Sequence, residues 1–562
     1  MIVRRRVRAL LVSVAVLAAA TGWQTVPPPT ADAVPTSTQR TEQPFASSSP
    51  VPGVVSSVVR HRVPLPASVG PHPAACDWIG YLRYRSVDGP SDPKRADRIL
   101  IAQPGIFEGA GSFESVARNT VAAAAAAGVH IEFWALDRRS NCLEDHTGLR
   151  AGLAERSLAT AADYYAKRTT IDGRRFAGFP TPDSPRLAWL AHVDLRQTLN
   201  DQYAIMRAEL PDRRARKQTF LCGGHSLGGS ITGHFAEWDF DGDPRTRDDA
   251  GHQQCGGWFA LDSTVSAGAP SSGGPREVGQ ILDAVAGAGT AALPVLWLPT
   301  LINAETMNLL ALVGLATHLD PDAVGQVMDA LPHNPNVDTS LRFLLAKDYG
   351  AAIAGQPDVR RLRATNEAVL GMLLDDDVQP VGILQASMGF VRPDDPMAPR
   401  SFPTPAGGRL PMLDDAPKYA PSAFDGHVYR WVDYDEVGTD RVGTRTPGPE
   451  VTSIGEIARD LSEPPLDFTE WYFPTALTVS LQNRAGAVRA RHHRYPGAAS
   501  HAPMITFRAG VGRPAEPSGA HGVVVTLPGY NHIDVVSAAR DQPDGGPEQV
   551  SHRLAEFAAP HS

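Results

Sequence analysis

The sequence lacks the excess of positive charge that nucleic-acid-binding proteins carry. Its 562 residues include 52 Lys and Arg against 61 Asp and Glu, which gives a formal net charge of −9. Two short basic clusters, at residues 213–217 and 489–494, are too small to reverse this balance, and we expect them to be solvated faces. The composition therefore argues against a nucleic-acid partner.

Long uninterrupted hydrophobic runs are also scarce. The most apolar internal stretch, residues 291–316, is interrupted by Pro294, Pro299, Asn303 and Glu305. A membrane-spanning helix needs about 20 consecutive apolar residues. We therefore expect this stretch to be a helical cap or core piece, and we expect no integral membrane span after processing.

A shorter apolar segment stands at the N-terminus. Four arginines between positions 4 and 8 precede an apolar run over residues 9–20, a pattern typical of a secretory signal peptide. We expect the signal peptide to cover residues 1–33, with small-residue cleavage sites near residues 18–20 or at Ala33; an uncleaved anchor is the alternative. The protein is thus predicted to be secreted or held in the cell envelope.

Cysteine is rare, with four residues in the chain. An even number in an exported chain indicates two disulfides, for which three connectivities are possible. Order along the chain favours Cys76–Cys142 and Cys222–Cys255, and the second pair would tie two successive strands on either side of a helix. Buried free thiols are the alternative.

Composition and periodicity divide the chain into segments. Residues 34–57 are rich in Pro, Ser, Thr and Val, and we expect them to form a disordered tether. From residue 58, apolar runs alternate with helical patterns, which predicts an α/β fold with a mostly parallel sheet and helices on both faces. The expected strands cover residues 76–86, 98–105, 129–137, 219–222, 257–262, 502–510 and 522–532.

The alternation stops in the middle of the chain. Residues 264–500 contain helical segments and long loops rich in Pro and Asp, and the strand pattern returns over residues 501–562. We therefore expect one α/β core, built from residues 58–263 and 501–562. A large helical cap or lid is inserted before the last two strands of this core.

One serine is surrounded by four glycines in the stretch TFLCGGHSLGGS, Thr219 to Ser230. Ser226 is the centre of a G-x-S-x-G motif that lies between an expected strand and an expected helix, the context of a nucleophile elbow. Such an elbow holds the serine in a strained backbone conformation, and glycines beside it avoid Cβ clashes. The stretch has neither a P-loop lysine nor a G-x-G-x-x-G pattern, so Ser226 is the predicted nucleophile.

A serine hydroxyl needs an adjacent base at neutral pH. Among 18 histidines, His532 fits because it follows the last expected strand. This placement gives the chain order Ser, acid, His. His225, inside the motif, is expected to pack or to line the pocket.

Two carboxylates compete for the role of the acid. Asp262 ends the strand that follows the nucleophile helix, at the functional edge of a parallel sheet. Glu516 is the one carboxylate in the loop after the penultimate strand. We favour Asp262 and keep Glu516 as the alternative, whereas Asp534 is expected to be a local hydrogen-bonding partner of the histidine loop.

Acyl transfer also requires donors for the developing oxyanion. The backbone N–H of Leu227, directly after the nucleophile, is one expected donor. The other should come from residues 104–112, PGIFEGAGS, in the turn after an expected strand. Ile106 and Phe107 are the candidates there, and we adopt Ile106.

The motifs QPGIFEG, GGHSLGG and LPGYNHID, in this order and each after a strand, resemble those of the α/β-hydrolase superfamily. Residues 134–148 and 470–474 further resemble exported serine hydrolases of actinobacteria. The resemblance implies the α/β-hydrolase fold and a Ser-His-acid esterase or lipase. The chain departs from the family pattern by lacking an Asp after the penultimate strand, and by having Gln103-Pro104-Gly105 where many members have His-Gly.

These observations predict a secreted serine esterase or lipase that cleaves a carboxylic ester through an acyl-enzyme, without a cofactor or a metal ion. The apolar helices of the insertion favour a small-molecule or lipid ester with a lipid-like or aromatic acyl group. An acyltransferase on the same triad and a peptidase are alternatives. A non-catalytic cell-surface binding protein on a hydrolase scaffold is a further one.

An acidic loop follows the predicted nucleophile helix. Asp239, Asp241 and Asp243 occupy positions one, three and five of a calcium-binding loop. Pro244, however, stands where that loop requires Gly, and Ala250 stands where it requires Glu. We expect a solvated loop, with a calcium site of another type as the alternative.

Overall fold

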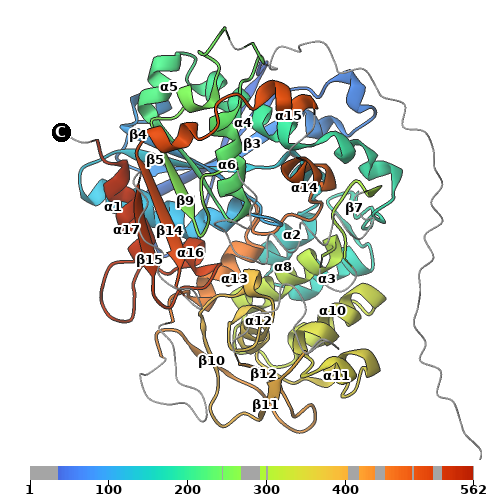
Figure 1. Ribbon diagram of the computed structural model, residues 1–562. Coiled ribbons are helices and arrows are strands. Elements are labelled where there is room, and N and C mark those ends of the chain that lie inside the picture. Colours follow the sequence, from blue (N-terminus) through green and yellow to red (C-terminus); the bar gives the residue numbers. More distant parts are fainter. Residues whose placement is uncertain are drawn as a thin grey trace, which may run out of the picture.

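The structure is a computed structural model that describes residues 36–243, 245–267, 292–298, 302–402, 417–436, 450–483, 487–510 and 522–560. Its centre is a nine-stranded sheet in the order β1-β2-β3-β5-β4-β8-β9-β14-β15 (Figure 1). The strands are β1 Arg40–Phe45, β2 Val54–Arg62, β3 Trp78–Ser86, β4 Arg98–Gln103, β5 Ile131–Asp137, β8 Phe220–His225, β9 Gly257–Leu261, β14 Met504–Ala509 and β15 Val523–Leu527.

Most of this sheet is parallel. The pairs β5–β4, β4–β8, β8–β9, β9–β14 and β14–β15 are parallel, whereas β1, β2 and β3 add an antiparallel edge. Together with helices on both faces, this arrangement is the α/β-hydrolase fold expected from the sequence. The expected antiparallel strand near residues 76–86 is β3.

Alternating residues of the strands face two separate cores, as the period of two in a β-strand requires. In β4, Ile99 and Ile101 pack in one core with residues of α4 and α6, while Leu100 packs in the other core with residues of α1 and α17. The helices outside the cap are α1 Glu114–Ala126, α2 Thr147–Glu155, α3 Leu158–Ala166, α4 Leu195–Glu209, α5 Arg213–Thr219, α6 Leu227–Glu237, α16 Asp534–Ser537 and α17 Gln549–Ala558.

The segment between β9 and β14 adds no strand to the main sheet in its described part and is mostly helical. It forms much of the lower half of the molecule in Figure 1, where α2, α3 and α8 meet. Its elements are α8 Ala304–Leu319, α9 Gln326–Ala330, α10 Pro335–Leu345, α11 Tyr349–Ala354, α12 Asn366–Leu374, α13 Ile454–Ser462, α14 Thr475–Gln482 and α15 Ala487–His492, with short strands β10 Gly389–Val391, β11 Met397–Arg400, β12 Lys418–Pro421 and β13 Trp431–Asp433. We call this segment the cap.

The N-terminal region differs from the expectation. Where the structure describes residues 34–57, the predicted disordered tether is wrong, because β1 and the start of β2 belong to the main sheet. Composition concealed these strands, whose backbone groups are satisfied by the pairing of β1 with β2 and of β2 with β3. Side-chain contacts also hold β1: Arg40 pairs with Glu209 of α4 at 2.7 Å. The predicted signal peptide, residues 1–33, lies outside the described residues.

Both disulfides expected from the order of the cysteines are present, Cys76–Cys142 and Cys222–Cys255. Cys222 lies in β8, and Cys255 lies just before β9, so the second bridge joins the chain on either side of α6. Besides the main sheet, β6 Thr170–Ile171 and β7 Arg174–Arg175 form a separate two-stranded sheet.

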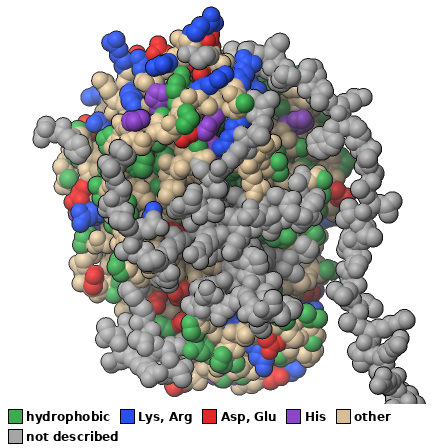
Figure 2. Space-filling view, in the orientation of Figure 1, with side chains coloured by type: hydrophobic (Ala, Val, Ile, Leu, Met, Phe, Trp, Pro, Cys, Tyr) green, Lys and Arg blue, Asp and Glu red, His purple; other side chains and the backbone are tan. Residues whose placement is uncertain are grey.

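The surface has an uneven distribution of charge. Figure 2 shows Lys and Arg side chains gathered at the top of the molecule, in the region of α5 and α15, which carry the two short basic clusters of the sequence. Within the described ranges, no helix is both long enough and apolar enough to cross a membrane.

Candidate active site

Ser226 lies at the turn between β8 and α6. Its φ of 54° and ψ of −120° are strained for a residue with a side chain, and such strain persists where function requires it. The turn brings α6 against β4: a Cβ on Gly228 would lie 2.0 Å from the carbonyl oxygen of Gln103. The glycine there is needed because the two backbones approach so closely.

The Ser226 side chain is buried, and Oγ has no hydrogen-bond partner in the described part of the chain. The backbone around it is fixed: its N–H donates to the carbonyl oxygen of Leu261 at 3.0 Å. The Ser263 hydroxyl donates to the Ser226 carbonyl oxygen. The elbow is therefore held by the segment that follows β9.

His532 and Asp262 lie together, 270 positions apart in the sequence. The Nδ1 atom of His532 is 2.6 Å from Oδ2 of Asp262, and the backbone N–H of Ala509 donates to Oδ1 of Asp262 at 3.0 Å. Asp262 directly follows β9, His532 follows β15, and both are buried. Glu516, the alternative acid, lies outside the described residues.

The surroundings of His532 favour its neutral form. Burial and then the positive charge of His225 lower the pKa of His532 below the usual value of 6.5, although the hydrogen bond and charge of Asp262 act in the opposite direction. A neutral imidazole whose Nδ1–H donates to a carboxylate leaves Nε2 able to accept a proton.

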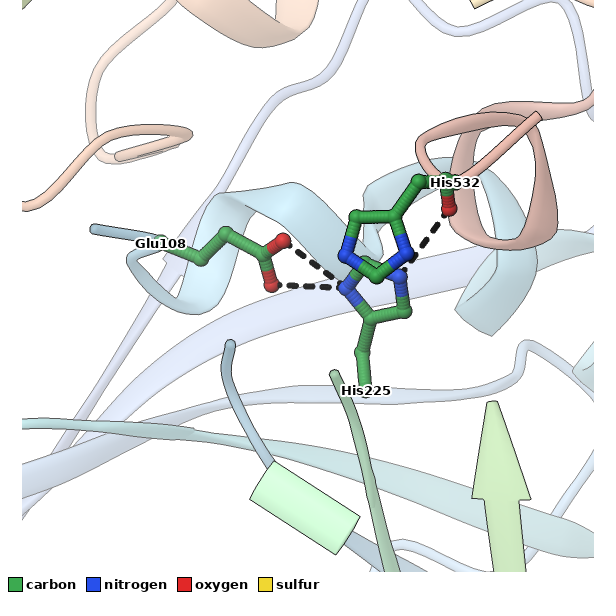
Figure 3. Close-up of side chains that lie close together, drawn as sticks. All are labelled: Glu108, His225 and His532. Atoms are coloured by element: carbon green, nitrogen blue, oxygen red, sulfur yellow. Dashed lines mark hydrogen bonds and ion pairs between the residues drawn. The ribbon is translucent and has the colours of Figure 1, made fainter. Parts of the chain in front are cut away.

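A second histidine–carboxylate pair lies against the first (Figure 3). The Nδ1 atom of His225 is 2.8 and 2.9 Å from the two carboxylate oxygens of Glu108, and its Nε2 is 3.0 Å from the carbonyl oxygen of His532. The centroids of the two imidazole rings are 4.4 Å apart. His225 thus links the loop after β4 to the loop that carries His532.

Glu108 and His225 each stabilise the charged form of the other. Burial opposes the charge of both groups, but Glu108 raises the pKa of His225, and His225 holds the pKa of Glu108 below its usual value. We had expected His225 to pack or to line the pocket, and it packs beneath His532. The G-x-S-x-G motif gives no signal for Glu108. The one clue in the sequence is that Glu108 is a carboxylate in the turn after β4, close to the expected oxyanion donors.

The same three residues have the donor atoms of a metal site. Glu108, His225 and His532 each offer one ligand atom within 4.8 Å of the others. Three of the four ring nitrogens are already in hydrogen bonds, to Glu108, to the His532 carbonyl oxygen and to Asp262. The arrangement is accounted for as a hydrogen-bonded network.

The turn after β4 contains the expected oxyanion donors. Ile106 and Phe107 both line the pocket that contains Ser226, and Phe107 has a φ of 62°. The N–H of Gly105 is engaged elsewhere, because it donates to Glu108 at 2.7 Å. Leu227, the other expected donor, is the first residue of α6, where backbone N–H groups are free to bind an anion.

A buried ion pair holds this turn in place. Arg138 donates to the carbonyl oxygens of Gly105 and Glu108 at 2.6 and 3.0 Å, and it pairs with Glu470 of the cap at 2.6 Å. The N–H of Glu470 donates to the carbonyl oxygen of Phe107 at 2.8 Å. The sequence assigns no role to either residue, because they are 332 positions apart and share no local pattern.

An apolar pocket connects Ser226 and His532 with the cap. Most of its lining residues are apolar, and helices α8, α10, α12 and α13 contribute many of them. The apolar lining residues are Ile106, Phe107, Met307, Leu310, Leu344, Leu373, Leu374, Ile383, Leu384, Ile457, Leu461, Phe468 and Ile533.

The sheet order and the position of Ser226 on it give the chain an α/β-hydrolase scaffold. No protein-family model and no curated protein matches the sequence. Among solved structures, the chain is similar to the peroxisomal alpha-beta-hydrolase Lpx1 from Saccharomyces cerevisiae, with 12% sequence identity and a TM-score of 0.30 over 93% of this chain and 91% of that one. A likeness at this level carries no argument about the site, and the resemblance to exported actinobacterial hydrolases stays a prediction.

Proposed function

We propose that the protein is a serine hydrolase that cleaves a carboxylic ester with an apolar acyl group. The observation that carries this proposal is the 2.6 Å contact between His532 Nδ1 and Asp262 Oδ2, together with the presence of His532 and Ser226 in one apolar pocket. In the proposal, Ser226 is the nucleophile, His532 is the general base and acid, and Asp262 orients the imidazole.

The proposed reaction forms an acyl-enzyme. Nε2 of His532 takes the proton of Ser226 Oγ as this oxygen attacks the carbonyl carbon of the ester. The N–H of Leu227 and a donor in the turn after β4, for which we favour Ile106, stabilise the negative charge on the carbonyl oxygen.

The intermediate then collapses in two steps. His532 gives its proton to the departing alkoxide, which leaves as an alcohol, and the acyl group stays on Ser226. A water molecule attacks the acyl carbon while His532 accepts its proton, and the carboxylic acid departs as the proton returns to Ser226. The lowered pKa of His532 supports this role, because the imidazole is neutral and able to accept a proton at pH 7.

The lining of the pocket supports an apolar acyl group, lipid-like or aromatic. Leucine, isoleucine, methionine and phenylalanine side chains of the cap surround the space next to Ser226. Burying such a group contributes about 0.8 kcal/mol per methylene. The two disulfides fit a protein of an oxidising compartment, and we propose that the enzyme is secreted or held in the cell envelope.

A fluorophosphonate probe tests the nucleophile directly. The purified protein should be labelled covalently, and the Ser226→Ala variant should not. Ser263→Ala is the matched control, because Ser263 is also buried and contacts the elbow through its hydroxyl, and this variant should still be labelled. No labelling, or labelling that survives Ser226→Ala, would replace the proposal with a non-catalytic binding protein on the same scaffold.

The acyl pocket is tested with p-nitrophenyl esters of increasing chain length. Leu310→Phe fills the pocket from α8, so kcat/KM for long acyl chains should fall roughly 10-fold or more while acetate is little affected. Leu319→Phe, on the same helix and outside the pocket lining, should keep the wild-type preference. Equal losses for all chain lengths in Leu310→Phe would place the acyl group elsewhere. Adding an alcohol to the assay distinguishes hydrolysis from acyl transfer. A hydrolase releases mainly the carboxylic acid, whereas an acyltransferase forms a new ester with the added alcohol.

A further inference from the structure

Five aspartates lie in the loop that connects α6 to the segment before β9. Two of them are in ion pairs: Asp243 with Arg245 at 2.5 Å and Asp248 with Arg213 at 3.2 Å. The other three are Asp239, Asp241 and Asp249. Each of these three offers one carboxylate oxygen within 4.8 Å of the other two.

Backbone N–H groups orient all three carboxylates, and Asp241 accepts from the N–H of Asp243 at 2.7 Å and from the hydroxyl of Thr246 at 2.6 Å. The N–H of Gly242 donates to Oδ1 of Asp239 at 3.0 Å, and the N–H of Asp241 donates to Oδ2 of Asp249 at 2.6 Å. The other oxygen of each group, Asp239 Oδ2 and Asp249 Oδ1, is buried and has no hydrogen-bond donor among the described residues. Asp239 and Asp249 are therefore each held in place through one oxygen, and the other oxygen of each is available to a ligand.

The charge of this cluster is not compensated within the described residues. Asp239 is 0% exposed, and no Lys or Arg there forms an ion pair with it, with Asp241 or with Asp249. The Arg491 side chain approaches Gly242 without pairing with the three carboxylates. A buried carboxylate without a partner is costly unless a proton or a cation neutralises it.

We propose that Asp239, Asp241 and Asp249 bind a calcium ion. A site made only of oxygen ligands with three negative charges suits a hard divalent cation, and Ca²⁺ tolerates the irregular geometry of a loop better than Mg²⁺ does. Water would complete the coordination of six to eight oxygens. The site differs from an EF-hand, because Asp243 is engaged by Arg245 and Asp249 supplies the third carboxylate.

The ion would fasten the loop that follows the nucleophile helix. Asp239 is two residues beyond the end of α6, and Asp249 is six residues before Cys255 of the disulfide to β8. Binding would therefore stabilise the folded state without touching the reacting atoms. The expected dissociation constant is about 10⁻⁴–10⁻³ M, as in extracellular calcium modules.

Thermal unfolding of the full chain, treated with EDTA and then dialysed, tests the proposal. Addition of 10 mM CaCl₂ should raise Tm by roughly 3 °C, and 10 mM MgCl₂ should raise it less. Asp239→Asn and Asp249→Asn should remove the response. Asp239→Asn should still fold, because it replaces an uncompensated buried charge with a neutral group of the same shape. Asp243→Asn and Asp248→Asn are the matched controls, and both should keep the response to Ca²⁺.

Terbium luminescence provides a second reading of the same site. Trp238 directly precedes Asp239, so excitation of tryptophan should sensitise bound Tb³⁺, and CaCl₂ should displace it. Asp239→Asn should abolish this signal, whereas Asp243→Asn should retain it. The proposal is overturned if the wild-type protein shows neither a Ca²⁺-dependent Tm nor displaceable Tb³⁺ luminescence, or if Asp243→Asn loses both as Asp239→Asn does. Neither reading depends on enzyme activity.

Discussion

Two histidine–carboxylate pairs lie side by side at the carboxyl end of the sheet, and the pKa values of their histidines are shifted in opposite directions. His532 is 2.6 Å from Asp262, His225 is 2.8 Å from Glu108, and all four side chains are buried. The pKa of His532 is nevertheless lowered, and that of His225 is raised. Similar contacts therefore go with a lowered pKa for one imidazole and a raised pKa for the other.

The difference arises from what surrounds each ring. Burial lowers the pKa of both, but His225 gains the charge and hydrogen bond of Glu108 and the further charge of Asp262. For His532, the positive charge of His225 comes after burial and ahead of the opposing hydrogen bond of Asp262. A positively charged neighbour thus lowers the pKa of a second histidine. Under the proposed function, one pair carries out proton transfer and the other pair tunes and positions it.

The largest expected effect comes from replacing Asp262, the carboxylate that contacts His532. Asp262→Asn should lower kcat for a p-nitrophenyl ester by about 10⁴-fold, because an amide no longer favours the tautomer with the proton on Nδ1. Glu108→Gln should lower kcat at pH 8 by less than about 10-fold, since Gln can keep the hydrogen bond to His225. Glu516→Gln should leave kcat near the wild-type value. A larger loss in Glu516→Gln than in Asp262→Asn would move the acid to residue 516.

An intermediate effect is expected on the pH profile. Because the pKa of His532 is lowered, the acid limb of kcat/KM for the wild-type protein should lie below pH 6.5. Glu108→Gln removes the negative charge of Glu108 and, with it, the support for the charge of His225. The charge of His225 lowers the pKa of His532 more than the charge of Glu108 raises it. Loss of both charges should therefore raise the pKa of His532 and move the acid limb to higher pH.

Glu209→Gln is the matched control for this measurement. Glu209 is a buried carboxylate 2.8 Å from the buried His61, on α4 and outside the residues that line the pocket. Its neutralisation should leave the acid limb in place. If Glu108→Gln also leaves the acid limb in place, Glu108 and His225 have no electrostatic influence on the pKa of His532.

The smallest expected effect is on stability. Glu108 has a lowered pKa when folded, so its contribution is present above its unfolded pKa of about 4.5 and is lost as pH falls through the folded value. His225 has a raised pKa, so its contribution is present below about 6.5 and is lost as pH rises through the folded value. Urea unfolding should show the largest difference between wild type and Glu108→Gln, about 1–3 kcal/mol, between pH 4.5 and 6.5. A difference that is constant from pH 4 to pH 9 would contradict this assignment of charges.

Much of the fold could be predicted from the sequence, and so could the places of the proposed site residues, because strand ends mark them. Ser226 and Asp262 each follow a buried strand, His532 follows the edge strand β15, and parallel strands bring their carboxyl ends to one edge. The order of the cysteines likewise predicted both disulfides, since each pair joins neighbouring elements of the alternating pattern.

Contacts between distant segments could not be predicted in this way. Glu108 and His225 are 117 positions apart, and Arg138 and Glu470 are 332 positions apart, so no local period or motif relates them. The edge strands β1 and β2 were missed for another reason. Their Pro, Ser and Val content is also that of a linker, and the pairing of β1 with β2 and of β2 with β3 decides their structure.

The anchoring of the Phe107 turn by Glu470 has a consequence for engineering. Glu470 belongs to the cap, yet its backbone N–H and its pairing with Arg138 fix the turn beside the serine elbow. Shortening the protein to its sheet and flanking helices would remove this brace and leave Arg138 as a buried cation without its carboxylate. A minimal scaffold cut from this chain would need a substitute for that one glutamate before its pocket could be redesigned.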